Sequence, residues 1–410
     1  MQATHTAGTP VKDLPRNVKL LLNAGHAIDH MFLLIFAAAV GVIAVDFEYA
    51  RWEDLMPFGV GAFVLFGLGA LPAGRLGDLW GRRQMMLVFF FGMGLSTLLA
   101  ATSQSAWQLA SALTLMGAFA SIYHPVGIPM LVQYSTRPGM TIGINGLAGN
   151  MGVAVAALLT GFLVKWLGWR AAFAVPAILS FVCGVLFLLW CPNETEPPSK
   201  RTVKAKVQLP RNMLARVLLV MTMAAVSGNL LYNFTTNGNG QLMVERFRGV
   251  LEDPALLGTL LALVYGLAAV AQVVVGRLLD RFDIKPLFMT MVLIQIPLLL
   301  LVSVSHGWVL YAALLVTMMF IFGAIPFTDV MIVRYVDDRF RSRVAGFRFT
   351  VSLGVSALAV WALGPFVKSA GFDMLFVLMA AIAICTLGTV ALLPSEKRVA
   401  AMSIKEESLS

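Results

Sequence analysis

The first long apolar segment of the sequence carries three ionisable side chains. His26, Asp29 and His30 follow one another at spacings i, i+3 and i+4. At about 100° per residue these positions share one face of a helix. A fourth ionisable group, His124, lies inside another apolar segment with Tyr123 beside it. Imidazoles and carboxylates are side chains that proteins commonly use to transfer protons, so this set predicts a proton-binding site.

The depth of these groups is what makes them candidates for function. Counted from Leu20 at about 1.5 Å per residue, His30 lies about 15 Å along its segment, and His124 lies equally deep in its own. Isolating a charge at the centre of a bilayer costs at least about 2.5–3.5 kcal/mol, so ionisable groups there are usually functional. A buried carboxylate near imidazoles changes its charge as water or substrate arrives, and Asp29 is therefore the candidate for a coupling proton.

The same residues are also competent metal ligands. Two histidines at i and i+4, a carboxylate and a further histidine could bind a transition metal. No thiolate or second carboxylate joins His26, Asp29, His30 and His124 in the sequence. We therefore predict no resident metal and no cofactor, and leave a transition-metal ion open as a transported substrate.

An internal repeat supplies a second polar segment. Adding 203 to Gly25, His26, Asp29 and His30 gives Gly228, Asn229, Tyr232 and Asn233. Amide side chains both donate and accept hydrogen bonds, so they suit a polar ligand, although hydrogen bonding between packed helices would also explain them. The predicted substrate and proton site comprises His26, Asp29, His30, Tyr123, His124, Asn150, Asn229, Tyr232, Asn233 and Asn237. The run from Asn237 to Gly240 predicts local unwinding of the helix.

Composition places these residues in a membrane protein. Of the 410 residues, 59% are hydrophobic and only 12% are charged, and the mean hydropathy is +0.83. A membrane-spanning helix needs roughly 20 apolar residues, and the apolar runs here are too long for strands of a barrel. The predicted spans lie near residues 20–45, 55–77, 84–103, 107–134, 140–165, 169–191, 212–236, 254–276, 285–304, 307–334, 343–367 and 371–393.

The repeat divides the chain into two halves with parallel topology. Gly74, Arg75 and Asp78 recur as Gly276, Arg277 and Asp280, and Gly161, Lys165 and Gly168 recur as Gly364, Lys368 and Gly371. Six spans per half keep both copies in one orientation, which is typical of halves related by an axis along the membrane normal. The predicted segments are an N-terminal segment (1–18), a six-helix bundle (19–191), a linker (192–211), a second six-helix bundle (212–394) and a tail (395–410).

The basic residues indicate topology and not nucleic-acid binding. The net charge is +9 and the pI about 9.7. With the N-terminus inside, 24 of the 30 Lys and Arg residues fall in inner loops and tails. Cytoplasmic loops retain positive charge, so both termini are predicted to be cytoplasmic and the first span uncleaved. No Walker motif occurs in the sequence, so we expect no ATP-driven pump. We also expect that the protein is not an enzyme.

The segment that follows the second span carries a motif of high specificity. Residues 74–83 read Gly-Arg-Leu-Gly-Asp-Leu-Trp-Gly-Arg-Arg, and 276–280 form a degenerate copy. This segment resembles the signature loop of the major facilitator superfamily, whose members are usually monomers. The resemblance implies that Asp78 pairs near the inner end of the eleventh helix, with Arg343 or Arg348, and so gates the transporter. The predicted gating residues are Gly74, Asp78, Gly81, Arg82, Arg83, Asp280, Asp329, Arg334, Arg343 and Arg348. For Asp329 an ion pair with Arg334 or Arg348 is expected.

Two shorter segments, His124-Pro125-Val126-Gly127 and residues 146–152, resemble the fosmidomycin-resistance branch of that superfamily. The resemblance implies a secondary transporter of the bacterial inner membrane that works by alternating access. Its expected activity is proton-coupled export of a small polar or amphipathic molecule, with protons, substrate and lipid as its only partners. The alternatives are proton-coupled uptake of a metabolite and transport of a transition-metal ion through the histidine cluster.

Overall fold

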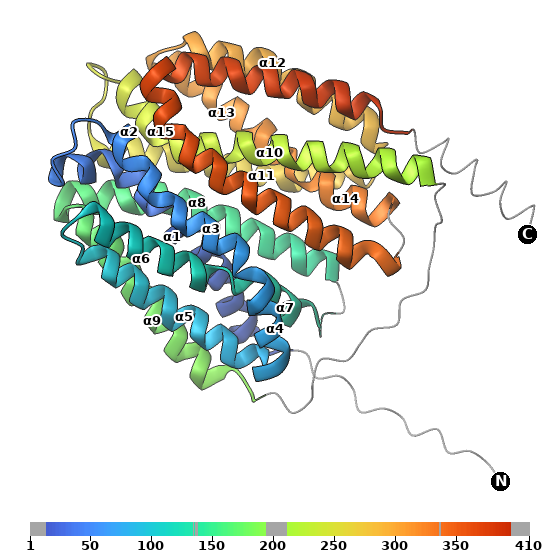
Figure 1. The fold of residues 1–410 in the computed structure, drawn as a ribbon, viewed down its shortest axis with the longest axis horizontal. Coiled ribbons are helices and arrows are strands. Elements are labelled where there is room, and N and C mark those ends of the chain that lie inside the picture. Colours follow the sequence, from blue (N-terminus) through green and yellow to red (C-terminus); the bar gives the residue numbers. More distant parts are fainter. Residues whose placement is uncertain (1–13, 134, 136–137, 194–210, 336–337, 395–410) are drawn as a thin grey trace, which may run out of the picture.

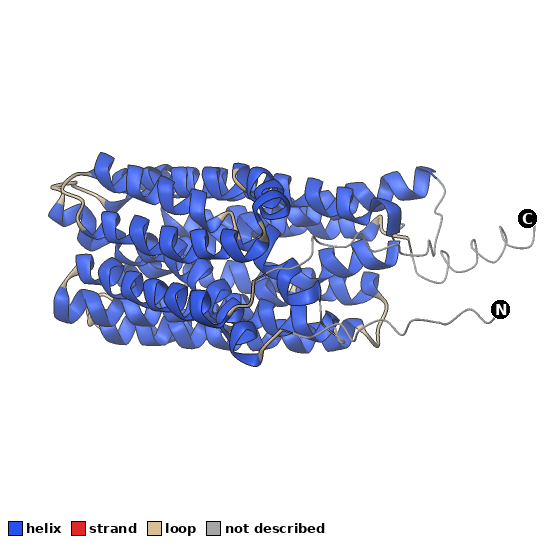
Figure 2. Ribbon diagram, turned by 90° about the horizontal axis from the view of Figure 1, so that it is seen from below, coloured by secondary structure: helices blue, strands red, loops and turns tan. Residues whose placement is uncertain are grey.

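The computed structural model describes residues 14–133, 135, 138–193, 211–335 and 338–394, and every regular element in these ranges is a helix (Figures 1 and 2). Helices satisfy all backbone hydrogen bonds within one segment, which is what an apolar chain needs in lipid. The elements are α1 (Arg16–Asp46), α2 (Trp52–Leu55), η1 (Met56–Gly59), α3 (Val60–Leu68), α4 (Ala70–Trp80), α5 (Arg82–Ala101), α6 (Ala106–Ala120), η2 (Tyr123–Gly127), α7 (Ile128–Gln133), α8 (Pro138–Leu167), α9 (Trp169–Trp190), α10 (Arg211–Arg246), α11 (Pro254–Leu279), α12 (Ile284–Val304), α13 (Gly307–Gly323), α14 (Ile325–Tyr335) and α15 (Asp338–Ala391).

With α15 divided at Gly371, the described helices are long and apolar enough for twelve crossings of a membrane. Among the described residues, ten helices are long and apolar enough to span it, and the pair Trp52–Leu68 and Ala70–Trp80, bent by 45°, supplies an eleventh. Helix α15 reverses at Gly371, whose φ of 78° and ψ of 170° are not helical, so its two arms are two spans instead of one. Figure 1 shows the second arm, in red, returning beside α12. The predicted number of spans agrees with this arrangement.

The two repeats form neighbouring groups of helices. In Figure 1 the blue and green elements occupy one side of the molecule and the yellow to red elements the other. The groups meet where α8 packs on α11, where α15 packs on α3, and where α1 packs on α10. The first two contacts correspond to each other in the repeat. The predicted N-terminal segment, linker and tail lie largely outside the described residues, and the domain boundaries stay a prediction.

Helix α10 corrects one expectation. It runs unbroken from Arg211 to Arg246, so residues 237–240 do not unwind. The side chain of Asn237 donates to the carbonyl of Asn233 at 3.0 Å, and Gly238 faces Leu363 and Phe372 of α15. Tertiary packing holds the helix through a run whose glycines and asparagines would favour a turn in water.

Candidate functional site

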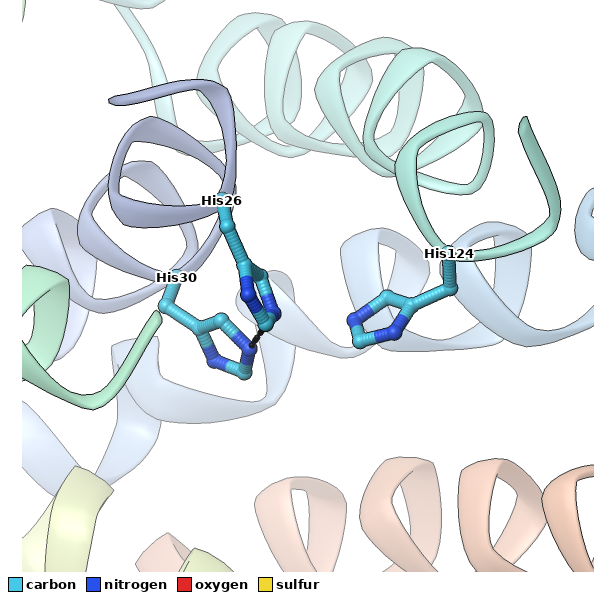
Figure 3. Close-up of side chains that lie close together, drawn as sticks. All are labelled: His26, His30 and His124. Carbon is cyan, nitrogen blue, oxygen red and sulfur yellow. Dashed lines mark hydrogen bonds between the residues drawn. The ribbon is translucent and has the colours of Figure 1, made fainter. Parts of the chain in front are cut away.

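The histidines of the first span meet the histidine of the fourth. His26 and His30 lie on one face of α1, and their Nε2 atoms are 3.2 Å apart. The ring of His124 approaches them edge-on, with centroids 5.1 Å from His26 and 5.8 Å from His30. Figure 3 shows the three rings converging from two helices. Four of the predicted site residues, His26, Asp29, His30 and His124, are therefore brought together.

An irregular turn in the fourth span aims His124 at α1. Residues Tyr123–Gly127 form one wider π-helical turn between α6 and α7. Pro125 lies in it, and proline cannot continue a helical hydrogen-bond ladder because it has no amide hydrogen. Such turns are frequent at functional sites. Gly127 leaves the space that the Tyr123 ring occupies, since a Cβ there would lie 2.9 Å from that ring.

Asp29 is the most unusual group in the cluster. Its side chain is fully buried, and neither carboxylate oxygen has a hydrogen-bond partner among the described residues. Nε2 of His124 lies 3.6 Å from Oδ2, and the side chain of His124 is 20% exposed. A buried carboxylate without hydrogen bonds is costly to keep ionised, so this residue is suited to carry a proton.

Asn145 of α8 is a hydrogen-bond centre that sequence reasoning missed. Its carbonyl oxygen lies 2.7 Å from Nδ1 of His26, and its side-chain amide donates to the hydroxyl of Tyr123 at 2.7 Å and to Asn23 at 3.0 Å. The Tyr123 hydroxyl donates in turn to the carbonyl of Leu22 at 2.7 Å. The signal was an asparagine just before the glycine-rich segment 146–152, in an otherwise apolar span.

Asn150 does not touch the histidine cluster. Its amide instead donates to Gln272 of α11, so the bond joins the two repeats. Gln272 was also missed, although a lone glutamine in an apolar span is itself a signal of a polar contact.

The polar face of α10 is mostly occupied by its own hydrogen bonds. Asn229, Asn233 and Asn237 each donate to the carbonyl four residues earlier. Asn233 also donates to Ser356 of α15 at 2.9 Å. The ring of Tyr232 packs on Phe322 of α13, with centroids 5.3 Å apart. Asn229 and Tyr232 are partly exposed, whereas Asn233 and Asn237 are buried.

The signature segment is more helical than expected. Gly74 and Asp78 lie within α4, and the turn to α5 consists of Gly81 alone, whose φ is 96°. Arg82 donates to Gln133 at 2.8 Å. Arg83 donates to backbone carbonyls at the end of α9, at 2.8 and 2.9 Å. These two arginines thus tie neighbouring helices of one repeat together.

The second group of predicted gating residues is only partly described. Arg348 pairs with Asp329 at 2.6 Å and donates to Thr328 at 2.6 Å. Arg334 donates to the carbonyl of Leu279, and Asp280 is exposed. The side chain of Arg343 lies outside the described residues, so its pairing with Asp78 stays a prediction.

Two ion pairs that the sequence did not suggest join the repeats at the opposite end. This end, which holds the end of α1 and the start of α11, is called here the outer end, following the predicted topology. Lys165 of α8 pairs with Asp253, and Lys368 of α15 pairs with Asp54. The hydrogen bond from Lys165 is the main cause that lowers the pKa of Asp253, and the backbone amide of Leu256 adds to it.

Glycines let the backbones approach beside these pairs. A Cβ on Gly161 would lie 2.5 Å from the carbonyl oxygen of Pro254, and one on Gly364 would lie 2.3 Å from that of Glu53. Lys165 and Lys368, like Gly161 and Gly364, are separated by 203 residues, so both contacts follow from the repeat. The sequence contained a signal for these contacts, the recurrence of a glycine and a lysine at the same spacing in both repeats. The sequence analysis used that recurrence only to infer that the two halves are parallel.

The histidine cluster could also hold a metal ion. One nitrogen from each of His26, His30 and His124 lies within 4.8 Å of the others. Two zinc–nitrogen bonds of about 2.0–2.1 Å at a tetrahedral angle separate the nitrogens by about 3.4 Å. The two residues of α1 are close to that separation, and His124 would have to move inward.

Comparison with known proteins places the chain. The sequence matches the Major Facilitator Superfamily over residues 24–243 and 241–408. It is 24% identical over 288 residues to the multidrug resistance protein MdtG of Serratia proteamaculans (strain 568), covering 68% of each chain. It is 32% identical over 153 residues to the puromycin resistance protein pur8 of Streptomyces alboniger, covering 36% of this chain and 29% of that protein.

The fold is shared with a solved transporter. The structure of a bacterial homolog of the human lysosomal transporter Spinster, in an inward-facing and occupied conformation, superposes with a TM-score of 0.70. The match covers 95% of this chain and 96% of that one, at 14% identity. The narrower resemblance to the fosmidomycin-resistance branch stays a prediction.

Proposed function

Because the chain belongs to the Major Facilitator Superfamily of transporters, we propose that it exports a small polar or amphipathic molecule in exchange for protons. It is an integral multi-pass membrane protein related to multidrug efflux proteins. We further propose that it acts as a monomer in the bacterial inner membrane with both termini in the cytoplasm. The 24 of 30 basic residues on the predicted inner side support this orientation.

The observation that supports proton coupling is the position of Asp29. It is fully buried and lacks a hydrogen-bond partner in the described part of the chain, while partly exposed His124 lies 3.6 Å away. A proton arriving at His124 can pass to the carboxylate, and a rearrangement that admits water would release it. Asp29 thus has a charge that depends on access, which is the property a coupled carrier requires.

The contacts between the repeats support an arrangement closed at the outer end. Lys165 and Lys368 each bridge the repeats there. Between that end and the histidines, the cavity bordered by Leu34, Thr236 and Tyr265 has a volume of only about 10 Å³. That is the space of roughly one water molecule. Substrate and protons would therefore reach the cluster from the inner side in this state.

We assign the substrate contacts to the partly exposed polar groups. Asn229 and Tyr232 retain exposed surface, whereas the amides of Asn233 and Asn237 are committed to protein acceptors. On the inner side we propose that Asp78 closes the opposite gate with Arg343 or Arg348. The ion pair between Arg348 and Asp329 would then exchange partners during the cycle.

Replacing Asp29 with asparagine tests the coupling. In proteoliposomes we expect the Asp29→Asn variant to lose uptake or efflux driven by a pH gradient, while exchange of labelled and unlabelled substrate at equal pH continues. The matched control is Asp46→Asn, at the far end of the same helix, where the carboxylate pairs with Arg170. Unchanged dependence on the pH gradient in Asp29→Asn would refute the assignment.

Drug-like cations and neutral amphiphiles are the substrates to screen first. The screen uses vesicles in which the protein is inserted in either orientation, because comparing the two orientations distinguishes export from uptake.

Metal-ion transport is the second candidate. It is favoured by the 3.2 Å separation of the two Nε2 atoms in α1 and by the clustering of the third histidine. A flux assay with Zn²⁺, Fe²⁺ and Mn²⁺ decides between the two cargoes. Flux of one of these ions that stops in His30→Ala would replace the proposal above, and absence of flux removes the metal alternative.

A further inference from the structure

We propose that Gly149 and the carbonyl of Asn145 on α8 are positioning elements that hold His26 in a single orientation and a single tautomer. The inference deepens the proposed function, because it assigns how the proton-carrying cluster is kept ready for transfer. This restriction of His26 to one orientation and one tautomer is called here the lock. It is a property of the folded chain and can be measured without transport.

The tautomer follows from the partner of Nδ1. That nitrogen lies 2.7 Å from the backbone carbonyl oxygen of Asn145, and a carbonyl oxygen only accepts hydrogen bonds. Nδ1 of His26 therefore carries the hydrogen. In the neutral ring the lone pair is then on Nε2, which faces Nε2 of His30 at 3.2 Å. His30 must donate in that contact, so the hydrogen bond between the two rings has a defined direction.

The orientation follows from what lies on each face of the ring. The Tyr123 ring stacks on His26 with centroids 4.8 Å apart and planes 15° from parallel. Gly149 lies against the imidazole, since a Cβ built on it would fall 2.7 Å from Cε1 and Nε2 of His26 and 2.9 Å from Nδ1. A distance under 3 Å leaves no room for a methyl group beside this ring. Only glycine at position 149 permits the observed ring position.

The two elements of the lock belong to one turn of α8. In an α-helix the amide of residue 149 also donates to the carbonyl of residue 145, so His26 must share that acceptor from the side. The missing side chain at Gly149 opens that side. The amide of Asn145 then fixes Tyr123 by donating to its hydroxyl at 2.7 Å. Carbonyl, glycine and stacked ring thus fix the orientation and the tautomer of one imidazole.

The lock is confined to the first repeat. At the offset of 203, His26, Asn145 and Gly149 correspond to Asn229, Arg348 and Ser352. Neither a titratable ring nor a glycine occupies the second copy. The groups that face His26 are Tyr123, His124 and Asn145 from the fourth and fifth spans and His30 from its own helix. The position of His26 is therefore polar in both repeats, but only the first repeat has an ordered imidazole there.

Nitrogen-15 NMR of the full chain, with labelled histidine, tests the lock directly, because the nitrogen shifts distinguish the two neutral tautomers. We expect a His26 signal of the Nδ1–H form, assigned by its loss in His26→Gln. In Gly149→Ala the ratio of that form to the other should fall by roughly tenfold, which corresponds to the loss of one buried hydrogen bond. The matched control is Gly146→Ala on the same helix, where an added Cβ meets nothing within 4 Å.

A second variant keeps the test decisive if Gly149→Ala does not fold. Tyr123→Leu removes the stacked ring and should also let both tautomers appear. An Nε2–H form of His26 in the unaltered protein, or an unchanged ratio in the folded variants, would overturn the proposal. If the tautomer shifts in Gly149→Ala while Asp29→Asn keeps its dependence on the pH gradient, the restriction of His26 stands and the proposed proton coupling fails. If gradient-driven transport depends on Asp29 while the tautomer is unaffected by position 149, the coupling stands and the lock fails.

Discussion

Single residues in this transporter divide into those with satisfied polar groups and those without. Asn229, Asn233 and Asn237 of α10 belong to the first class, because each donates to a carbonyl on its own helix. Asp29 belongs to the second class, with both oxygens lacking hydrogen bonds within the described residues. The sequence could place both sets on polar faces, but it could not distinguish them. Whether an amide points at a neighbouring carbonyl or at a ligand depends on the register of packed helices.

Asn233→Ala tests that distinction at one residue. Asn233 bonds Ser356 of α15 at 2.9 Å, and bonds between membrane helices are worth about 0.6 kcal/mol on average. We expect a loss of stability of about that size in thermal or denaturant unfolding in detergent, with the substrate KM unchanged. Ser356→Ala, which removes the other partner, should have the same effect. A raised KM at unchanged stability would instead make Asn233 a substrate ligand.

At the scale of elements, close packing of helices depends on glycines at the crossings. A Cβ on Gly117 of α6 would lie 2.0 Å from the carbonyl oxygen of Ala62 in α3, and a backbone atom cannot move aside as a side chain can. The sequence showed many glycines in apolar spans and correctly suggested packing. It could not show which of them lie at a crossing, because that depends on which helices become neighbours.

Gly117→Ala and Gly388→Ala separate crossing glycines from the others. The first should destabilise the protein by about 1–3 kcal/mol, the usual cost of overpacking. The second, in α15 where an added Cβ meets nothing within 4 Å, should be neutral or slightly stabilising because alanine favours helix. Thermal unfolding of the purified variants measures both. Equal stability of the two variants would contradict the crossing of α3 and α6.

At the scale of the whole molecule, the internal repeat carried most of what could be predicted. The repeat predicted the parallel halves, and the lengths of the apolar runs predicted the twelve spans, because both can be counted in the sequence. It missed the outer ion pairs, since pairing depends on which helices of opposite halves meet. It also missed a charge exchange within the halves. In the first repeat Arg170 pairs with Asp46. In the second repeat the position of Arg170 is taken by Asp373, which accepts from Arg246.

That exchange separates two kinds of ion pair at the outer end. Arg170 and Arg246 join helices within one half, and Lys165 and Lys368 join the two halves. Only the second kind must break if the halves separate there. We therefore expect the outer pairs to favour the closed state without adding to the stability of either half, so that their removal changes the conformational equilibrium alone.

Replacing Lys165 and Lys368 together with alanine tests this role. Thr236, which borders the closed cavity, serves as a reporter when changed to cysteine in a chain without Cys183, Cys191 and Cys385. We expect a membrane-impermeant thiol reagent added outside to label it several-fold faster in the double variant. Arg170→Gln, which breaks a pair within one half, should label at the parent rate. Equal labelling of parent and double variant would show that the lysines do not hold the outer end closed.

The pKa of Asp253 adds a dependence on external pH. Because the hydrogen bond from Lys165 lowers this pKa in the folded chain, the pair is at full strength above the ordinary aspartate pKa of 3.8. It is lost as the pH falls through the lowered value, where the carboxylate takes up a proton. Labelling of the parent, measured relative to a fully exposed cysteine at the same pH because only the thiolate reacts, should therefore increase in strong acid. The double variant should not respond through this pair. The acid response thus separates loss of the ion pair between Lys165 and Asp253 from a general loosening of the bundle. General loosening would accelerate labelling in both chains alike.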